Sequence, residues 1–194
     1  MLVILSGVAG AGKDTIIREI TKRMSNVCTV PSYTTRPPRA DDIPGVSYNF
    51  VTKEEFEQLI DNGDIYEYDI HHNNYYGSSK HIINEKAKTG IVIKDIDVNG
   101  TEKFKEILTD IKVVTIFLRV PKDELKRRLE NRIDKLSHEQ IMLRLNRFDY
   151  EESKMDIYDY VMKNDDLEKA LAVIQTIIEQ EYAKEQRELK NKEN

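Results

Sequence analysis

Short apolar runs alternate along this chain with segments whose apolar residues recur at helical spacing. The runs at residues 2–5, 91–97 and 113–118 are rich in branched apolar side chains, which is typical of buried parallel strands. From Ile16 onward, apolar residues recur every three or four positions and predict a helix. Because strands that alternate with helices imply a parallel sheet covered on both faces, the pattern predicts an α/β fold.

The second half of the chain continues this alternation. We expect helices at residues 101–108, from Pro121 onward and at 167–182, and a short last strand at 158–161. A short strand at residues 27–30 follows the first helix. The polar end of the chain, residues 183–194, is predicted to fray.

Residues 32–79 interrupt this rhythm with short strands and turns. Strands are expected at residues 46–51 and 65–70, and a helix at 53–62. Thr52 and Glu55 have the spacing of a capping box at the start of that helix. Residues 73–79 have the composition of a turn. We therefore interpret this part of the chain as an insertion, followed by a helix up to about residue 90.

The stretch between the first strand and the first helix carries the clearest chemical signal. It reads Gly7-Val8-Ala9-Gly10-Ala11-Gly12-Lys13-Asp14-Thr15, with the spacing G-x-x-x-x-G-K. Glycines let backbone N–H groups curl around a phosphate, and the helix N-terminus adds partial positive charge. Lys13 would reach the β- and γ-phosphates. The strand-loop-helix setting favours nucleotide binding over a glycine-rich turn.

Composition narrows the class of protein. The 194 residues carry a formal net charge of −5, with acidic and basic residues interspersed. The chain therefore lacks the overall excess of basic residues that is typical of nucleic-acid-binding proteins. No apolar run approaches the length of a membrane span or of a signal peptide. The one cysteine, Cys28, excludes an intramolecular disulfide. We expect a single globular domain in the cytoplasm, with no membrane and no nucleic-acid partner.

Three further groups are candidates for phosphate or metal contact. Arg36 and Arg39 lie on a proline-rich segment, where guanidinium groups would match phosphate oxygens, but a solvated surface loop is equally compatible. Asp95 and Asp97 end a core strand, which favours Mg²⁺ and substrate contact over simple capping. A basic cluster fits either a solvated face or a lid that closes on phosphate. It comprises Lys126, Arg127, Arg128, Arg132, Arg144 and Arg147.

Taken in order, these motifs resemble those of the guanylate kinases over residues 2–182. The resemblance implies a P-loop three-layer sandwich with a parallel central sheet, an inserted GMP-binding subdomain and a short helical lid. It implies one domain with a core at residues 1–30, 90–131 and 148–185, an insert at 31–89, a lid at 132–147 and a polar tail at 186–194. The shared motifs are the loop at 7–15, Ser32-x-Thr34-Thr35-Arg36-x-Pro38-Arg39, Gly45-x-x-Tyr48-x-Phe50, Glu67, Tyr75-Tyr76-Gly77-Ser78, Asp95-Ile96-Asp97, the basic segment and Asn164-Asp165-Asp166.

The same resemblance implies residue roles. ATP would bind at Gly7, Val8, Ala9, Gly10, Ala11, Gly12, Lys13, Asp14, Thr15 and Asn164. GMP or dGMP would bind at Ser32, Arg36, Arg39, Tyr48, Glu67, Tyr76, Ser78 and Asp97. The residues that act on the transferring phosphoryl group would be Lys13, Arg36, Arg132 and Arg144, with Arg128 as a further candidate. Mg²⁺ would accompany ATP, held by Asp14 or Thr15 together with Asp95.

Three departures from the family pattern leave alternatives open. Asp14 stands where a serine or threonine hydroxyl usually binds Mg²⁺, and Lys94 is charged where the family usually has an apolar strand residue. The lid sequence, Asn131-Arg132-Ile133-Asp134, lacks the usual glycine-threonine pair. The resemblance implies ATP-dependent phosphorylation of GMP to GDP. The alternatives are weak activity, a changed acceptor, or a non-catalytic protein-binding module. The oligomeric state stays open.

Overall fold

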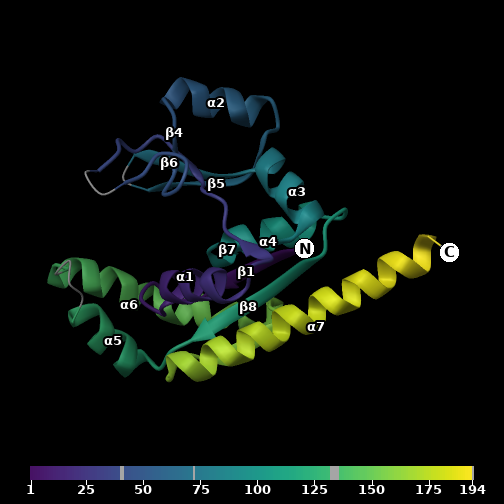
Figure 1. The fold of residues 1–194 in the computed structure, drawn as a ribbon. Helices are drawn as coiled ribbons and strands as arrows, with labels where there is room; N and C mark the ends of the chain where they lie inside the picture. The colour runs from purple at the N-terminus through teal and green to yellow at the C-terminus, as the bar shows by residue number, and fades with distance from the viewer. Residues whose placement is uncertain (40–41, 72, 132–135, 194) are drawn as a thin grey trace.

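A five-stranded parallel sheet forms the centre of the molecule, with strand order β2-β7-β1-β8-β9 (Figure 1). The structure, a computed structural model, describes the chain except residues 40–41, 72, 132–135 and 194. Every residue of β1 is buried, because the strand pairs on both sides and both its faces are covered. The strands are β1 Leu2–Ser6, β2 Val27–Cys28, β7 Ile91–Asp95, β8 Val113–Arg119 and β9 Tyr160–Lys163.

Helices cover both faces of this sheet and complete three layers. One apolar core holds Val3 and Leu5 of β1 against four helices, and a second core holds Leu2 and Ile4 against two. The first four are α1 Lys13–Arg23, α5 Lys122–Glu130, α6 His138–Ser153 and α7 Leu167–Glu193; the other two are α3 Lys80–Thr89 and α4 Val98–Ile107. A single turn of 3-10 helix, Met155–Ile157, precedes β9. The predicted α/β three-layer fold is confirmed.

The interrupting segment forms a second sheet, in the order β4-β3-β6-β5, beneath helix α2 (Figure 1). We call this second sheet and α2 the insert. Its elements are β3 Tyr33–Thr34, β4 Asn49–Phe50, α2 Lys53–Asp61, β5 Ile65–His71 and β6 Asn74–Ser79. Phe56 is the buried residue of α2, and its ring stacks on Tyr75 with the centroids 5.0 Å apart.

Several predicted boundaries were wrong. Of residues 73–79, expected as a turn, Asn74–Ser79 form β6 because this segment pairs antiparallel with both β3 and β5. The strand expected at 46–51 shrinks to β4, since residues 45–47 form a turn closed by hydrogen bonds to Ile43 and Tyr48. Helix α1 begins at Lys13 rather than Ile16, with Gly12 as its N-cap.

The end of the chain is helical rather than frayed over its described part. α7 continues to Glu193, and its extension past the core is visible in Figure 1. The amino group of Met1 lies 3.7 Å from a carboxylate oxygen of Glu185, and Lys112 lies 2.6 Å from a carboxylate oxygen of Glu181. These ion pairs attach the helix to the sheet. Among the described residues, no helix is long and apolar enough to cross a membrane.

The capping box at Thr52 generates a stability prediction. Its hydroxyl accepts a hydrogen bond from the Glu55 N–H, and the Glu55 carboxylate accepts one from the Thr52 N–H. Thr52→Ala should lower the free energy of unfolding by about 1 kcal/mol, measured by urea denaturation. Thr52→Ser retains the oxygen and should stay close to wild type. Equal losses in the two variants would contradict a role for the cap.

Candidate functional site

The loop that follows β1 has a backbone that only glycine adopts easily. Gly7, Gly10 and Gly12 have φ values of 138°, 101° and 96°. A Cβ atom on Gly7 would lie 2.5 Å from the backbone oxygen of Leu118, so β8 leaves no room for a side chain there. Positive φ values and the close approach of β8 therefore both require glycine in the predicted phosphate loop.

Two side chains hold this loop from the carboxyl edge of the sheet. The amide of Asn164, which follows β9, donates to the Ala11 carbonyl oxygen at 2.6 Å and is buried. The Arg128 guanidinium of α5 donates to the Asn164 carbonyl oxygen at 2.7 Å. Asn164 was predicted near the adenine of ATP, whereas its amide contacts the loop backbone in this structure. Arg128 therefore supports the loop through Asn164.

Lys13 places its charge at the mouth of the loop. Its ammonium donates to the carbonyl oxygens of Gly7 at 2.7 Å and Val8 at 3.4 Å. The loop opens into a cavity of about 440 Å³, which we call the loop cavity. It is lined by Ala9, Gly10, Gly12, Lys13, Asp14, Thr15, Asp95, Arg128 and Arg144. Most of the predicted ATP-binding residues therefore converge, and so do the predicted metal ligands.

The metal candidates supply hard oxygen ligands. Asp14 lies in the first turn of α1, where the helix dipole favours a carboxylate, and Thr15 follows it. Asp95, at the end of β7, lines the same cavity. The described residues contain no group of three or more His, Cys, Asp or Glu side chains that would hold a metal alone. A carboxylate or two completed by nucleotide phosphates and water is the usual arrangement for Mg²⁺, and these residues fit it.

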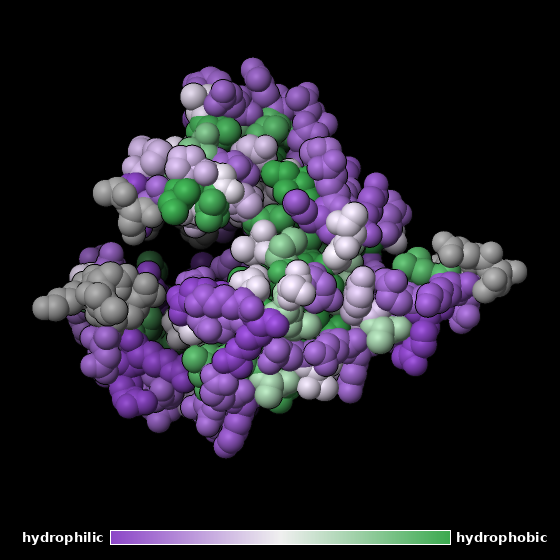
Figure 2. Space-filling view, in the orientation of Figure 1, coloured by the Kyte–Doolittle hydropathy of each residue, from purple (hydrophilic) through white to green (hydrophobic). Residues whose placement is uncertain are grey.

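A second cavity, of about 380 Å³, lies where the insert meets the end of β7. We call it the insert cavity; Figure 2 shows the hollow between the insert and the part of the molecule that holds α1 and α6. It is lined by Ser32, Tyr48, Glu67, Asp69, Tyr76, Gly77, Ser78, Lys94, Asp95, Ile96 and Asp97. Asp95 lines both cavities, so the two are neighbours across one carboxylate.

Glu67 and Ser78 face each other in the insert cavity from adjacent strands of the insert. The Ser78 hydroxyl donates to a carboxylate oxygen of Glu67 at 2.6 Å. Burial raises the pKa of Glu67, while the Ser78 hydrogen bond and the charge of Lys94 oppose that shift. Tyr48 and Tyr76 meet edge to face, with ring centroids 5.8 Å apart. Six of the eight predicted GMP-binding residues therefore line one cavity: Ser32, Tyr48, Glu67, Tyr76, Ser78 and Asp97.

The two arginines of the proline-rich segment do not line the insert cavity in this structure. The Arg36 guanidinium forms an ion pair with Asp42 at 2.8 Å and lies over the Tyr48 and Phe50 rings. Arg39 contributes its backbone N–H to the same carboxylate at 2.7 Å. Asp42 was not predicted, since a carboxylate in a polar turn gives no distinct sequence signal.

Asp97 caps the N-terminus of a helix, whereas the alternative left by the sequence was capping of the strand end. One carboxylate oxygen accepts a hydrogen bond from the Gly100 N–H at 2.8 Å and caps α4. The other lies 3.6 Å from the Arg147 guanidinium of α6. Asp97 follows the end of β7 and still lines the insert cavity, whereas it is absent from the described lining of the loop cavity.

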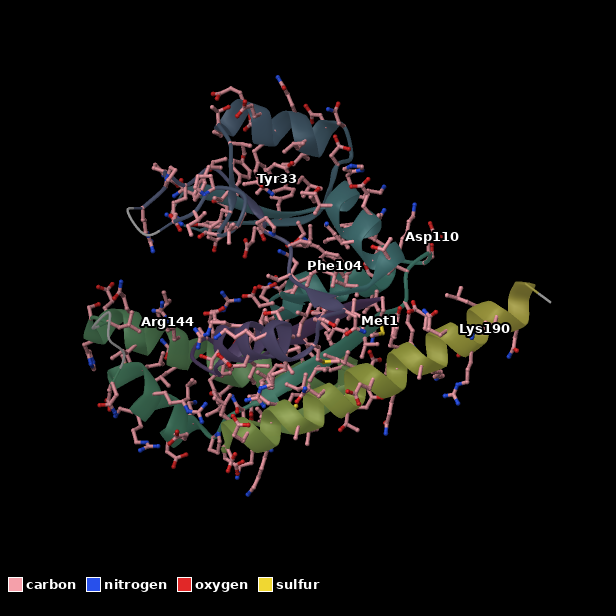
Figure 3. The ribbon with its side chains drawn as sticks, viewed as in Figure 1. Met1, Tyr33, Phe104, Asp110, Arg144 and Lys190 are labelled. Carbon is pink, nitrogen blue, oxygen red and sulfur yellow. The ribbon has the colours of Figure 1, made fainter. Side chains whose placement is uncertain are left out.

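The predicted lid arginines are described only in part. Arg144 lies on α6 (Figure 3) and lines the loop cavity together with Lys13 and Asp14 of α1. Its guanidinium donates to the Gln140 carbonyl oxygen at 3.0 Å, within the same helix. Arg132 lies outside the described residues.

A third cavity, of about 570 Å³, contains none of the predicted residues. It is lined by Arg119, Pro121, Lys122, Phe148, Glu152, Val161, Met162 and Lys163. Its cations already pair with carboxylates: Arg119 with Glu152 at 2.8 Å, and Lys122 with Asp149 at 2.9 Å. Volume alone therefore does not identify the site in this molecule.

Burial of Glu67 predicts a pH-dependent stability. Because the pKa of Glu67 is raised in the folded state, ionising it costs stability as the pH rises above the ordinary carboxyl range. Glu67→Gln should therefore melt at a higher temperature than wild type at pH 7 to 8, and the difference should vanish near pH 4 and below. Thermal unfolding followed by circular dichroism across this range measures it.

The matched control for this comparison is Glu106→Gln, which makes the same chemical change on the exposed side of α4. It should melt with the wild type at every pH. A Glu67→Gln protein that is less stable than wild type at neutral pH would contradict the prediction.

Comparison with known proteins agrees with this geometry. The guanylate kinase family model matches residues 1–181. The chain is 38% identical over 186 residues to the guanylate kinase of Wolbachia sp. subsp. Brugia malayi, covering 95% of this chain and 94% of that protein. It is 39% identical over 189 residues to that of Oceanobacillus iheyensis, covering 96% and 90%. The crystal structure of guanylate kinase from Anaplasma phagocytophilum superposes with a TM-score of 0.73 at 30% identity, covering 93% and 85%. With a matching loop, insert and relatives over nearly its whole length, the chain belongs to the guanylate kinase family.

Proposed function

We propose that this protein transfers the γ-phosphoryl group of ATP to GMP, and to dGMP, forming GDP or dGDP. The observation that carries the proposal is the pair of cavities that share Asp95: one is built by a phosphate loop and the other by Glu67 and Ser78. Donor and acceptor phosphates would meet at the end of β7, where in-line transfer needs them.

Guanine recognition rests on Glu67. The guanine N1–H and N2–H₂ groups are adjacent donors, and a carboxylate accepts hydrogen bonds from both. Ser78 holds one oxygen of that carboxylate from the neighbouring strand. Adenine offers no such pair of donors, which favours GMP over AMP. Asp97 adds a second carboxylate on the same wall of the cavity.

The acceptor phosphate would be held by Ser32, Arg36, Arg39, Tyr48 and Tyr76. Guanidinium forks match phosphate oxygens, and tyrosine hydroxyls donate to them. Arg36 reaches the phosphate only when its ion pair with Asp42 opens. A doubly charged phosphate competes well for a guanidinium that is shared with a single carboxylate.

The donor phosphates would lie on the loop of residues 7–15, with Lys13 on the β- and γ-phosphates and Asn164 near the adenine. Arg132 and Arg144 would neutralise the transferring group, supported by Arg128. Arginines in this role contribute about 10³–10⁵ in rate in phosphoryl-transfer enzymes. The attacking oxygen belongs to an anionic phosphate, so the transfer needs no general base.

Mg²⁺ is the cofactor that this donor set fits, held by Asp14 or Thr15 together with Asp95. Bound with ATP, it would neutralise charge on the β- and γ-phosphates. We place the reaction in the cytoplasm, because the one cysteine, Cys28, is free and suits a reducing compartment. Neither a nucleic acid nor a membrane is required by the proposed reaction.

A coupled assay for ADP formation tests the function directly. With ATP and Mg²⁺, GMP and dGMP should support turnover, whereas AMP, UMP and CMP should give rates near background. Lys13→Ala should reduce turnover by about 10²-fold or more, because the charge on the phosphates is lost. Absence of GMP-dependent ADP at high protein concentration would refute the proposal, and a better acceptor than GMP would reassign it.

Asp14 generates a separate prediction. A carboxylate next to a triphosphate is repelled unless a cation lies between them. Asp14→Ser restores the hydroxyl that the loop motif usually carries, so kcat/KM for ATP should stay at the wild-type level or rise. The measurement is steady-state kinetics at several Mg²⁺ concentrations. A loss comparable to that of Lys13→Ala in a normally folded protein would identify Asp14 as a required metal ligand.

A further inference from the structure

Lys94 is a charged residue on an otherwise apolar face of the central sheet. It lies on β7 directly opposite Ile4 of β1. Val92 precedes it on the same face of β7, and Ile96 follows just after the strand, both in the same apolar cluster. The side chain is buried, with a relative exposure of 5%. Burying an ammonium group is costly unless it is well partnered, and lysines are rarely buried to this extent. Its partners therefore indicate what it does.

Those partners lead into the insert cavity. The Lys94 ammonium donates to the Ser32 hydroxyl oxygen at 2.6 Å and to the Val30 carbonyl oxygen at 3.4 Å. Among the ion pairs of the described residues, none within 4.0 Å involves Lys94. Both Lys94 and Ser32 line the cavity. The charge is therefore held beside the cavity by neutral oxygens.

This contact fixes the direction in which the Ser32 hydroxyl donates. An ammonium group only donates, so it occupies a lone pair of the Ser32 oxygen and leaves the hydroxyl hydrogen for another acceptor. No described residue accepts a hydrogen bond from the Ser32 side chain. The hydrogen is thus available to a ligand in the cavity, and the adjacent positive charge strengthens it as a donor.

The charge of the cavity wall makes this donor significant. Four carboxylates line it, those of Glu67, Asp69, Asp95 and Asp97, and Lys94 is the one cation among the described lining residues. Arg36, one of the two arginines predicted to bind the phosphate, does not line the cavity and is paired with Asp42. A phosphate that enters this acidic cavity therefore needs a positive charge in the cavity wall, and Lys94 supplies one.

We propose that Lys94 is a positioning residue that directs and polarises the Ser32 hydroxyl as a hydrogen-bond donor to the phosphate of the acceptor nucleotide. The inference rests on the proposed function, because it takes the insert cavity as the GMP site. It adds a residue that discriminates the phosphorylated nucleotide from the nucleoside. It also predicts that the effect of Lys94 passes through Ser32.

The test compares GMP with guanosine, which lacks the phosphate. Lys94→Met retains the length of the side chain and removes its charge. Calorimetric titration should show roughly 10- to 100-fold weaker GMP binding, the range expected for a lost charged hydrogen bond, and unchanged guanosine binding. KM for GMP should rise by a similar factor while KM for ATP stays constant. Lys88→Met, the same change at an exposed position of α3, should match wild type throughout.

A double-mutant cycle tests the route through Ser32. Ser32→Ala alone should weaken GMP binding, and adding Lys94→Met to it should cost much less than the same change in wild type. Additive losses would overturn the proposal, and so would equal losses of GMP and guanosine affinity. If Lys94→Met does not fold, Lys94→Gln is the substitute, because it retains a neutral donor. It should also weaken the binding of GMP and not that of guanosine, but by a smaller factor.

The measurements on wild type distinguish failure of the proposed function from failure of the proposed role of Lys94. If wild type binds GMP and forms GDP but Lys94→Met binds GMP as tightly as wild type, the role of Lys94 is refuted and the proposed function stands. If wild type neither binds GMP nor forms ADP in its presence, both the function and the role of Lys94 are refuted.

Discussion

The parallel pairing of β1 with β7 is the constraint on which the site depends. Its register places Leu5, the last residue but one of β1, opposite Asp95 at the end of β7. The phosphate loop therefore starts beside the carboxylate that separates the two cavities. A shift of one residue in this register would move Lys94 to the face that Asp95 now occupies, and Asp95 to the face of Lys94, because side chains alternate along a strand. Both the loop and the insert thus take their positions from one buried pairing.

Charge is the second constraint, because the proposed substrates are polyanions and much of the wall that they face is acidic. The cations are distributed over four elements: Lys13 on α1, Lys94 on β7, Arg128 on α5 and Arg144 on α6. Two cations are held by carboxylates, Arg36 by Asp42 at the edge of the insert and Arg128 by Glu124. A phosphate that binds at either one would compete with a carboxylate for the guanidinium.

The sequence predicted the parts of the fold that local rules determine. Hydrophobic periodicity predicted the core strands and most helices, and glycine spacing predicted the loop after β1. Gly7, Gly10 and Gly12 of that loop have positive φ values. Sequence patterns failed where strand pairing determines the structure. Residues 73–79 have a turn's composition, yet Asn74–Ser79 form β6 between two partner strands. The contact of Asn164 with Ala11 joins segments distant in sequence, so no local pattern reveals it. The pairing of Arg36 with Asp42 lies within one short loop, where a carboxylate in a polar turn gives no distinct sequence signal. The sequence shows Lys94 as a charged residue at a strand position that is usually apolar in the family. Only its contact with Ser32, seen in the structure, indicates what the charge does.

Buried charge is where stability and function oppose each other in this molecule. The pKa of Glu67 is raised and the pKa of Lys94 is lowered, in both cases mainly because burial disfavours the charged form. Each group favours the ionised form of the other, so the pair lowers the cost of retaining both charges. Apolar residues at both positions together would stabilise the fold more readily than two buried charges do. The two charges are therefore best explained by what enters the cavity: a base with two adjacent donors on one side, and a phosphate on the other.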